Sequence, residues 1–363
     1  MKCVFLHQSI IPHDAIGNDI AHMYKILGRK HDVFVYCNIL LNRKLKSLNR
    51  KVLFDFISNE DNLIIYHHSN YWEEGEEILN SAKARVIFKY HCITPASFFK
   101  KWCDDYYFLC KHGCEQTRTI FEKHNDCLWM GDSHYNFTEA GIAGCSDTFV
   151  IPPFNNLEQW KNVAPDEAIL KSLLESPAIN WLFVGRMAPN KGHRMLIEIL
   201  NDYVSHYDKN IAIYIVGRND DRLSAYNKEI EELIAACGLF DQVIWVQEVS
   251  DSTLLSYFLG CDFYLNCSDH EGFCVPIVEA QSLCLPVIAK HAGAVPETIG
   301  REQLILNDDL AEYSAAIRIL SQNDSYRDYM VKMGRENYLN RFSNEIIERK
   351  FIKVVEDYVG ASL

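Results

Sequence analysis

Two glutamates, Glu271 and Glu279, stand on either side of a predicted strand-to-helix turn. An apolar run ends just before Ser268, the stretch from there to Gly272 has the composition of a turn, and helical spacing begins near Val275. Glu271 is therefore expected in the loop and Glu279 just inside the helix, with both carboxylates facing one crevice. A carboxylate accepts two hydrogen bonds, so each suits the vicinal hydroxyls of a sugar ring or a ribose. The same spacing also fits two ordinary exposed glutamates at a helix start, where the helix dipole stabilises acidic residues.

Two cations, Arg186 and Lys191, follow an earlier strand pattern in the segment FVGRMAPNKGHRMLIEIL, which starts at Phe183. Gly185 and Arg186 come directly after the strand, and Lys191 and Gly192 open a predicted helix. Unpaired backbone N–H groups at a helix N-terminus favour a phosphate, and two cations can hold it. The spacing is not that of a P-loop, which needs G-x-x-x-x-G-K-[ST]. The segment therefore predicts an anion site, with solvated loop charges as the alternative.

A third loop is built from small residues and reads HAGAVPE from His291 to Glu297. It follows a predicted strand and precedes a predicted helix, and Gly293 and Ala294 leave its backbone amides accessible. The carboxyl ends of parallel strands meet at one edge of a sheet, so the three loops are expected to converge there. Cations and amides would hold a diphosphate and carboxylates would hold hydroxyls, which is how a nucleotide-sugar is bound.

These loops must be positioned by a parallel sheet. The order of strand and helix patterns along the chain predicts two such sheets. Short apolar runs alternate with helical stretches along nearly the whole chain, which is typical of βαβ units. The predicted strands cover residues 2–6, 32–36, 62–66, 85–90 and 148–151 in a first series and 181–184, 211–216, 242–246, 262–265 and 286–289 in a second. The predicted fold class is α/β, with two Rossmann-like doubly wound domains facing a central cleft.

The predicted domains follow from a polar stretch with several prolines that separates the two series of strands. Residues 1–155 form the first domain, 156–178 a linker and 179–342 the second domain. Helical patterns at 310–321, 325–340 and 344–358 follow the last strand, and three helices in a row cannot all cover the second sheet in simple alternation. Residues 343–363 are therefore expected to pack back on the first domain.

Composition excludes several classes of protein. The chain has 363 residues, of which 48% are hydrophobic, and no apolar run approaches the ~20 residues of a membrane span. Thirteen cysteines without a secretory leader predict a reducing, cytoplasmic setting. The net charge is −13, but residues 1–155 hold 17 Lys and Arg against 18 Asp and Glu, so the acidity lies in the second half. Nucleic-acid binding is not expected.

The motifs resemble those of the retaining glycosyltransferases of family 4, which have the GT-B fold. The resemblance rests on G-R-x-x-x-x-K-G at residues 185–192, the E-x7-E pair in EGFCVPIVE, the PVIA strand and G-x-x-P-E at 293–297. Two N-terminal segments agree with it, DAIGND at 14–19 and YHCITPASFF at 90–99, of which the second is similar to a segment of one bacterial branch. The resemblance implies that the first domain binds the acceptor and the second the nucleotide-sugar.

By this resemblance the donor site belongs to the second domain. Arg186 and Lys191 would bind the diphosphate and compensate the charge that develops on the leaving group. Glu279 would bind the ribose hydroxyls, and Glu271 would contact the transferred sugar. The residues that would complete the donor site are glycines and the loop after Glu271: Gly17, Gly185, Gly272, Phe273, Cys274 and Gly293.

The first domain would contribute two residues, His91 near the sugar and the acceptor and Gly17, which keeps its loop low enough for the donor phosphates. The sequence departs from the family at two positions. Cys274 stands where the family commonly has glycine, and Cys92 stands where the similar segment has asparagine. A side chain at position 274 is expected to narrow the sugar pocket, so donor choice is the property most affected.

The resemblance implies front-face attack, in which the leaving phosphate oxygen deprotonates the acceptor hydroxyl. Such a reaction needs stabilisation of the departing diphosphate more than a protein nucleophile. No metal is expected, because Arg186 and Lys191 can replace it, and Cys103, Cys110 and Cys114 lack zinc-site spacing. The expected function is transfer of a hexose from GDP-mannose or a UDP-sugar to a glycan or lipid-linked acceptor in bacterial surface polysaccharide synthesis. A GT-B sugar-nucleotide epimerase or hydrolase and a non-catalytic sugar-nucleotide-binding subunit are the alternatives.

A basic stretch, NRKLKSLNRK at residues 42–51, interleaves leucines with cations. Such a stretch can bind anionic lipid headgroups at the inner face of the cytoplasmic membrane, or it can be an ordinary solvated surface. The cations expected to make this contact are Arg43, Lys44, Lys46, Arg50 and Lys51.

Overall fold

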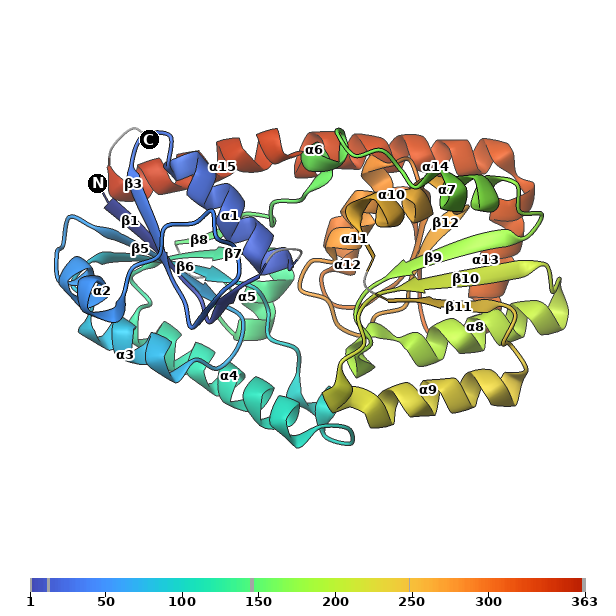
Figure 1. The fold of residues 1–363 in the computed structure, drawn as a ribbon, viewed down its shortest axis with the longest axis horizontal. Coiled ribbons are helices and arrows are strands. Elements are labelled where there is room, and N and C mark those ends of the chain that lie inside the picture. The colour runs from blue at the N-terminus through green and yellow to red at the C-terminus, as the bar shows by residue number, and fades with distance from the viewer. Residues whose placement is uncertain (1, 12–13, 144–146, 248, 361–363) are drawn as a thin grey trace. The chain divides into compact units, whose positions relative to one another are not determined.

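The computed structural model describes residues 2–11, 14–143, 147–247 and 249–360 (Figure 1). The chain forms two compact units. Unit 1 comprises Met1–Ser97, Asp105–Asn155 and Phe342–Leu363, and unit 2 comprises Phe98–Asp104 and Asn156–Arg341. Among the described residues, no helix is long and apolar enough to cross a membrane.

Unit 1 is built on a six-stranded parallel sheet with the order β3-β1-β5-β6-β7-β8. The strands are β1 (Lys2–Leu6), β3 (Asp32–Tyr36), β5 (Leu63–His68), β6 (Arg85–Tyr90), β7 (Leu128–Gly131) and β8 (Thr148–Val150). A separate two-stranded pair is formed by β2 (Ser9–Ile10) and β4 (Ile39–Leu40). The central strand β5 is buried along its whole length, as expected for a parallel strand covered on both faces.

The helices of unit 1 begin at residues that suit a helix start. They are α1 (Ala15–Leu27), α2 (Arg50–Ile57), α3 (Glu73–Ser81), α4 (Asp104–Lys123, of which all but the first residue belong to unit 1), α5 (His134–Ala140) and α15 (Asn344–Val359). A 3-10 turn at Ala96–Phe99 begins in unit 1 and ends in the segment assigned to unit 2. The side chains of Asp14, Asn49 and Ser133 cap α1, α2 and α5 by accepting hydrogen bonds from backbone N–H groups in the first turn.

The last helix, α15, completes the core of unit 1 (Figure 1). Its Phe351 and Val355 are buried in the same cluster as Phe5 of β1 and Met23 of α1. Tyr358 near its end donates a hydrogen bond to the Val86 carbonyl at 2.9 Å. The helix that the sequence places after residue 343 therefore belongs to unit 1.

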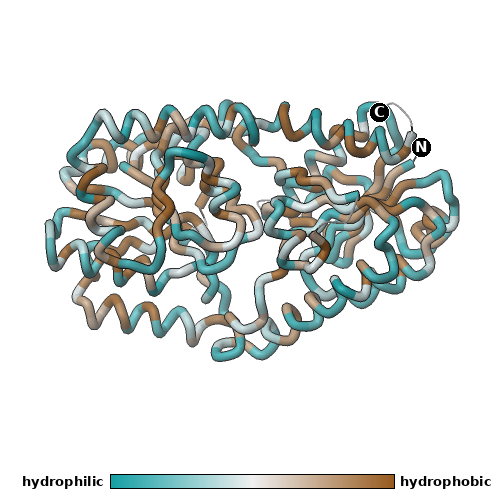
Figure 2. The backbone as a smooth tube through the Cα atoms, turned by 180° about the vertical axis from the view of Figure 1, so that it is seen from behind, coloured by the Kyte–Doolittle hydropathy of each residue, from teal (hydrophilic) through white to brown (hydrophobic). Residues whose placement is uncertain are grey.

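Unit 2 repeats the architecture, with the strand order β11-β10-β9-β12-β13-β14. Its strands are β9 (Ile179–Val184), β10 (Ile211–Val216), β11 (Val243–Val246), β12 (Phe263–Asn266), β13 (Val287–Lys290) and β14 (Leu304–Leu306). Its helices are α6 (Leu157–Trp160), α7 (Glu167–Leu174), α8 (His193–His206), α9 (Ser224–Cys237), α10 (Asp251–Gly260), α11 (Val275–Ser282), α12 (Val295–Ile299), α13 (Leu310–Gln322) and α14 (Asp324–Asn337). In Figure 2 the strands of both sheets are mostly hydrophobic, whereas the outer helices alternate between hydrophobic and hydrophilic residues.

The predicted fold class is confirmed, and the ten predicted strands are all present with ends shifted by a few residues. Four further strands were not expected from the sequence. Strands β2 and β4 have only two residues each, and β7 and β14 offer only three or four residues before a polar or glycine-containing turn. Residues 156–178 contain α6 and α7 and lie in unit 2, where Trp160 is buried against Phe258.

Candidate functional site

The three loops predicted to converge follow three adjacent strands of unit 2. Strands β9, β12 and β13 are neighbours in the sheet, and the strand order reverses between β9 and β12. In open α/β sheets, ligands bind at the carboxyl ends of the strands at such a reversal point. The loops at 185–192, 267–274 and 291–294, called the donor loops below, all leave this edge.

Gly192 joins the first donor loop closely to the second. Its φ is +70°, and a Cβ at this position would lie 1.8 Å from the Cys267 carbonyl oxygen. Beside it, the Asp269 N–H donates to the Asn190 carbonyl at 2.9 Å. A glycine is therefore required both by the left-handed backbone and by the approach of the second loop.

Lys191 and Glu271 meet across these two loops. The Lys191 Nζ lies 2.7 Å from Glu271 Oε1, with side chains that are 22% and 9% exposed. This ion pair fixes the orientation of both side chains at the edge of the sheet, where the sequence predicts a cation and a carboxylate. Arg186 lies in the same loop as Lys191 and is exposed, and Gly185 precedes it.

The third donor loop supports the second from the other side. Gly293 has φ +54°, and a Cβ there would lie 2.4 Å from the Glu271 carbonyl oxygen. That oxygen accepts a hydrogen bond from the Ala294 N–H at 2.9 Å, and the Thr298 hydroxyl donates to the Phe273 carbonyl at 2.6 Å. The backbone around Gly272 is thereby held from both neighbouring loops.

Glu279 is half-buried on α11 without a partner of its own. No hydrogen bond or ion pair joins its side chain to another described residue. Burial, with a smaller contribution from the Asp251 carboxylate, raises the pKa of Glu279 to about 7. Ionising a partly buried carboxyl that has no partner lowers the stability of the folded protein. The same carboxylate is available to accept hydrogen bonds from a ligand.

The two cysteines at which the sequence departs from the family both have left-handed backbones. Cys274, at the start of α11, has φ +72°, and Cys92, after β6, has φ +59°. Glycine and asparagine, which the resemblance described above places at positions 274 and 92, are the residues that tolerate this region best. The Cys274 side chain is buried and its Sγ lies 3.3 Å from the Asn266 side-chain nitrogen.

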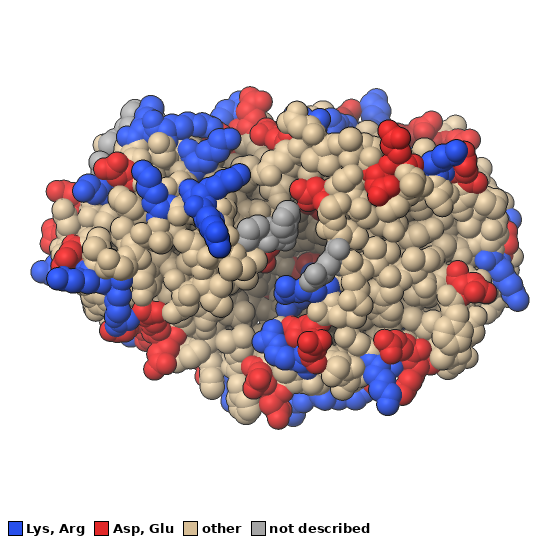
Figure 3. All heavy atoms as spheres, viewed as in Figure 1, with Lys and Arg blue, Asp and Glu red and all other residues tan. Residues whose placement is uncertain are grey.

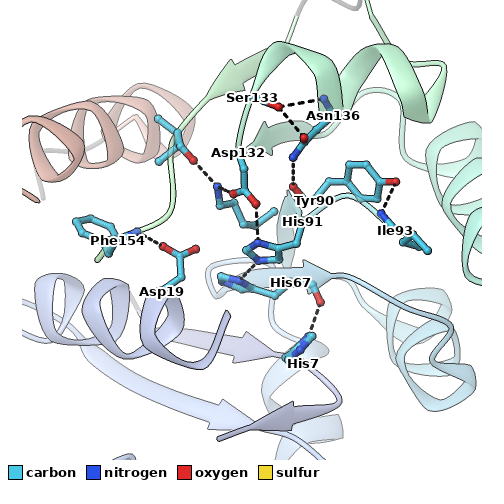
Figure 4. A network of polar contacts seen from close by, with 12 residues as sticks. His7, Asp19, His67, Tyr90, His91, Ile93, Asp132, Ser133, Asn136 and Phe154 are labelled. Atoms are coloured by element: carbon cyan, nitrogen blue, oxygen red, sulfur yellow. Dashed lines mark hydrogen bonds and ion pairs between the residues drawn. The ribbon is translucent and has the colours of Figure 1, made fainter. Parts of the chain in front are cut away.

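In unit 1, His91 belongs to a buried polar network with His67, Lys89 and Asp132, called the unit 1 network below (Figure 4). The His91 Nδ1 donates to Asp132 Oδ2 at 3.1 Å, and its Nε2 lies 2.8 Å from His67 Nδ1. The Lys89 ammonium donates to Asp132 Oδ1 at 2.5 Å and also to the Ile151 carbonyl. Burial tends to raise the pKa of Asp132, but Lys89 and His91 outweigh burial and the pKa is lowered. Asp132 is therefore an anion that orients His91.

This network lies at the carboxyl ends of β5, β6 and β7, on one side of the reversal point of the unit 1 sheet, which falls between β1 and β5. His67 is the last residue but one of β5, and His91 and Asp132 follow β6 and β7 directly. Of these residues only His91 was predicted. The signal that could have found the others is their place at the carboxyl ends of neighbouring strands, because no motif joins them.

Gly17, the other predicted residue of unit 1, lies in the first turn of α1. A Cβ there would lie 2.2 Å from the Ile11 carbonyl oxygen, so the close packing of this turn requires a glycine. The structure therefore brings the predicted residues of the donor loops together in unit 2, and it places His91 and Gly17 in unit 1.

The basic stretch at 42–51 is a loop up to Asn49 and becomes helical at Arg50. Its leucines do not form an exposed apolar face, because Leu45 is buried in the unit 1 core and Leu48 is half-buried. Arg50 pairs with Glu74 and Glu77 at 2.5 and 2.6 Å. All five cations of the stretch are exposed. In Figure 3, Lys and Arg gather on the unit 1 face around α1 and α15.

Comparison with known proteins agrees with this arrangement. Residues 167–337 match the family described as glycosyl transferases group 1. An uncharacterized 41.2 kDa protein in the cps region of Klebsiella pneumoniae is 25% identical over 289 residues, which cover 78% of this chain and 74% of that protein. A D-inositol 3-phosphate glycosyltransferase of Geodermatophilus obscurus is 26% identical over 224 residues, which cover 59% of this chain and 48% of the relative.

Among solved structures, Anabaena HepE in complex with UDP and glucose aligns with a TM-score of 0.73 at 18% identity, over 98% of this chain and 100% of HepE. At 18% identity the structural likeness shows a shared fold only. The family match and the relatives indicate the class of protein. Together the findings support a glycosyltransferase with the GT-B fold that is similar to family 4, and residues 167–337, just under half of the chain, carry the match to the glycosyl transferases of group 1.

Proposed function

We propose that the protein is a retaining hexosyltransferase that moves a sugar from a nucleoside diphosphate donor to a glycan or lipid-linked acceptor in bacterial surface polysaccharide synthesis. The observation that carries the proposal is the pairing of Lys191 with Glu271 beside the unpartnered Glu279, at the reversal point of the unit 2 sheet. Lys191 and Glu271 lie in two adjacent donor loops and Glu279 lies on α11, so these elements supply a cation for a diphosphate and carboxylates for hydroxyls. The cps-region relative supports a role in polysaccharide synthesis.

In the proposed reaction, Lys191 and Arg186 bind the diphosphate and Glu279 accepts hydrogen bonds from the ribose hydroxyls. Glu271 and the backbone amides of Gly272, Phe273 and Cys274 contact the transferred sugar. The negative charge on the diphosphate grows as the glycosidic bond breaks, so the cations stabilise the transition state more than the bound donor. The leaving phosphate oxygen takes the proton of the acceptor hydroxyl, and no metal on the diphosphate is required.

Glu271 has a second part in this proposal. Without donor, the Glu271 carboxylate neutralises the Lys191 ammonium. A diphosphate bound to Lys191 would neutralise the ammonium in its place. Glu271 would then be released toward the hydroxyls of the transferred sugar. In unit 1, the unit 1 network keeps the His91 ring in a fixed orientation, which suits a residue that contacts sugar or acceptor.

The donor is proposed to be GDP-mannose or a UDP-sugar, and the UDP and glucose bound to HepE favour testing UDP-glucose first. A panel of nucleotide-sugars should be incubated with the protein, with and without acceptor glycans, while nucleoside diphosphate release and product anomers are measured. A transferase consumes one donor faster when acceptor is present and forms a product with the donor's anomeric configuration. Equal consumption without acceptor favours a hydrolase, an altered sugar on an intact nucleotide favours an epimerase, and binding without consumption favours a non-catalytic subunit.

Peripheral contact with anionic lipid at the inner face of the membrane is proposed through Arg43, Lys44, Lys46, Arg50 and Lys51. Because the leucines of this stretch face inward, the contact would be electrostatic, so it should weaken with salt. A variant with Arg43, Lys44 and Lys46 changed to Gln should lose co-sedimentation with anionic vesicles at low salt. A control with Lys171, Lys209 and Lys228 of unit 2 changed to Gln should keep it. Equal recovery of the wild type with neutral and anionic vesicles would contradict the proposal.

A further inference from the structure

A short piece of chain between two elements of unit 1 belongs to unit 2. Residues Phe98–Asp104, called the docked segment below, follow β6 and lead into α4, but their contacts assign them to unit 2. Phe98 and Trp102 both meet aromatic side chains of unit 2. The transfer proposed above gives these two residues no part, so their place against unit 2 requires an explanation.

Trp102 anchors the docked segment on α9. Its ring and the buried Tyr226 ring are T-shaped, with 5.3 Å between centroids and 75° between planes. The Lys101 Nζ lies 4.0 Å from the centre of the Trp102 ring and 2.5 Å from Glu229 Oε2. Edge-to-face aromatic contacts and cation–π contacts have specific geometries, so this end of the segment has a defined place on α9.

Helix α9 is in turn fixed to the first donor loop. The Tyr226 hydroxyl lies 3.4 Å from Nδ1 of His193, which directly follows Gly192. Tyr226 and His193 are buried, and their rings are T-shaped with 6.1 Å between centroids. The surface that holds Trp102 is therefore continuous with the loop that carries Lys191.

The backbone of the docked segment forms a tight turn that connects Trp102 to Phe98. The N–H groups of Trp102 and Cys103 both donate to the Phe99 carbonyl at 2.9 Å. The Phe99 side chain is buried, and Phe98 is half-buried. Anchoring Trp102 on α9 therefore also fixes Phe98.

Phe98 packs against His270, the residue before Glu271 in the second donor loop. The two rings are tilted by 49° with 6.3 Å between centroids, and His270 is 4% exposed. The His270 carbonyl accepts a hydrogen bond from the Asn190 side chain at 3.4 Å. His270 is thus held at its ring by the docked segment and at its backbone by the first donor loop.

This support matters most when a donor is bound. Without donor, Lys191 holds the Glu271 carboxylate at 2.7 Å. In the proposed function, on which this inference rests, a bound diphosphate releases Glu271 from Lys191 toward the transferred sugar. The direction of the released carboxylate then depends on its backbone, which is next to His270. A misplacement of about 1 Å can lower the rate of a reaction by about 100-fold.

We propose that Phe98 and Trp102 are positioning residues for the transferred sugar. Trp102 anchors the docked segment, and Phe98 holds His270. His270 then keeps the Glu271 carboxylate directed at the sugar hydroxyls once the diphosphate has bound. The docked segment begins seven residues after His91, so one stretch of chain carries a group proposed to contact the acceptor and supports a group proposed to contact the donor sugar.

The affinity for a nucleotide-sugar relative to that for its nucleoside diphosphate tests this role. UDP-glucose and UDP are the probes in titration calorimetry without acceptor, and GDP-mannose and GDP replace them if the wild type binds only the guanosine pair. Phe98→Ala should keep the affinity for the diphosphate within about twofold and lower both the affinity for the nucleotide-sugar and kcat about tenfold, because only the sugar depends on Glu271. A purely structural defect would weaken the binding of both probes alike.

Conservative variants and a matched control separate positioning from folding. Phe98→Leu keeps an apolar side chain against His270, and Trp102→Phe keeps a ring on Tyr226, so both should regain most of the preference for the nucleotide-sugar. Phe108→Ala removes an aromatic side chain of α4 that is 50% exposed, and it should behave like the wild type. If Phe98→Ala does not fold, Trp102→Ala carries the test, because it releases the same segment from α9.

Two results would overturn the positioning role while leaving the proposed function intact. One is an equal loss of affinity for the nucleotide-sugar and the diphosphate in Phe98→Ala. The other is wild-type affinity for the nucleotide-sugar together with wild-type kcat in that variant. A wild type that binds none of the nucleotide-sugars would instead contradict the proposed function, and this inference with it.

Discussion

Replacing Glu279 by Gln should stabilise the protein at neutral and alkaline pH while impairing donor binding. The native structure holds this glutamate in a half-buried place where no described residue pairs with it, and its pKa rises from 4.5 to about 7. Glutamine has the same shape as the protonated carboxyl and carries no charge. It therefore avoids the cost of ionising position 279 in the folded state.

The size of the effect follows from the shift in pKa. Each tenfold change in the proton equilibrium is worth about 1.4 kcal/mol, so a pKa that rises from 4.5 to about 7 corresponds to roughly 3 kcal/mol. Because the folded pKa lies above the unfolded one, the native state binds more protons between these values. The contribution of Glu279 to stability is therefore lost as pH rises from about 4.5 to about 7 and stays lost above that range.

Urea unfolding of wild type and Glu279→Gln at pH 5, 6, 7 and 8 measures this directly. The stability advantage of the variant should be small at pH 5 and approach roughly 3 kcal/mol at pH 8. Glu231→Gln makes the same substitution at an exposed position of α9 and should change stability by less than about 0.5 kcal/mol at every pH. A Glu279→Gln advantage that does not grow with pH, or a variant less stable than wild type at pH 8, would refute the reasoning.

Three further predictions concern the donor loops. Lys191→Ala should lower kcat by roughly 100-fold or more and change KM much less, because the diphosphate charge grows in the transition state; an unchanged kcat with a raised KM would show that Lys191 contributes only uniform binding. Cys274→Gly should relieve about 1 kcal/mol of backbone strain at φ +72° and change the order of preferred donors in the nucleotide-sugar panel, whereas an unchanged donor order would remove this side chain from specificity. Gly192→Ala should destabilise unit 2 by several kcal/mol in urea unfolding, since its Cβ would overlap the Cys267 carbonyl, and a shift below about 1 kcal/mol would show that the two loops separate easily.

The parts of the site that could be predicted from sequence are those whose residues lie close together in the chain. Lys191 and Glu271 were each found because a strand, a loop and a helix start follow one another within a few residues, and parallel topology then brings the loops to one edge. The unit 1 network could not be found in this way. His67, Lys89 and Asp132 come from three different strand ends, and only the pairing of β5, β6 and β7 makes them neighbours.

Other features depend on packing that no local pattern encodes. The four-residue strand β7 was missed, although Asp132 follows it directly. The lack of a partner for Glu279 depends on which side chains surround α11. The left-handed backbone at Cys92 and Cys274 could not be predicted from the sequence, because cysteine rarely adopts it.

The contribution of α15 to the unit 1 core affects the order in which the chain can fold during synthesis. Unit 2 is complete once Arg341 has been made, whereas the unit 1 core needs Ile347, Phe351 and Val355, which are translated later. The apolar surface along β1 and α1 therefore stays uncovered until α15 has left the ribosome, although the strands of unit 1 are translated first. A released chain that ends at residue 341 should therefore contain a protease-resistant unit 2 and a protease-sensitive unit 1.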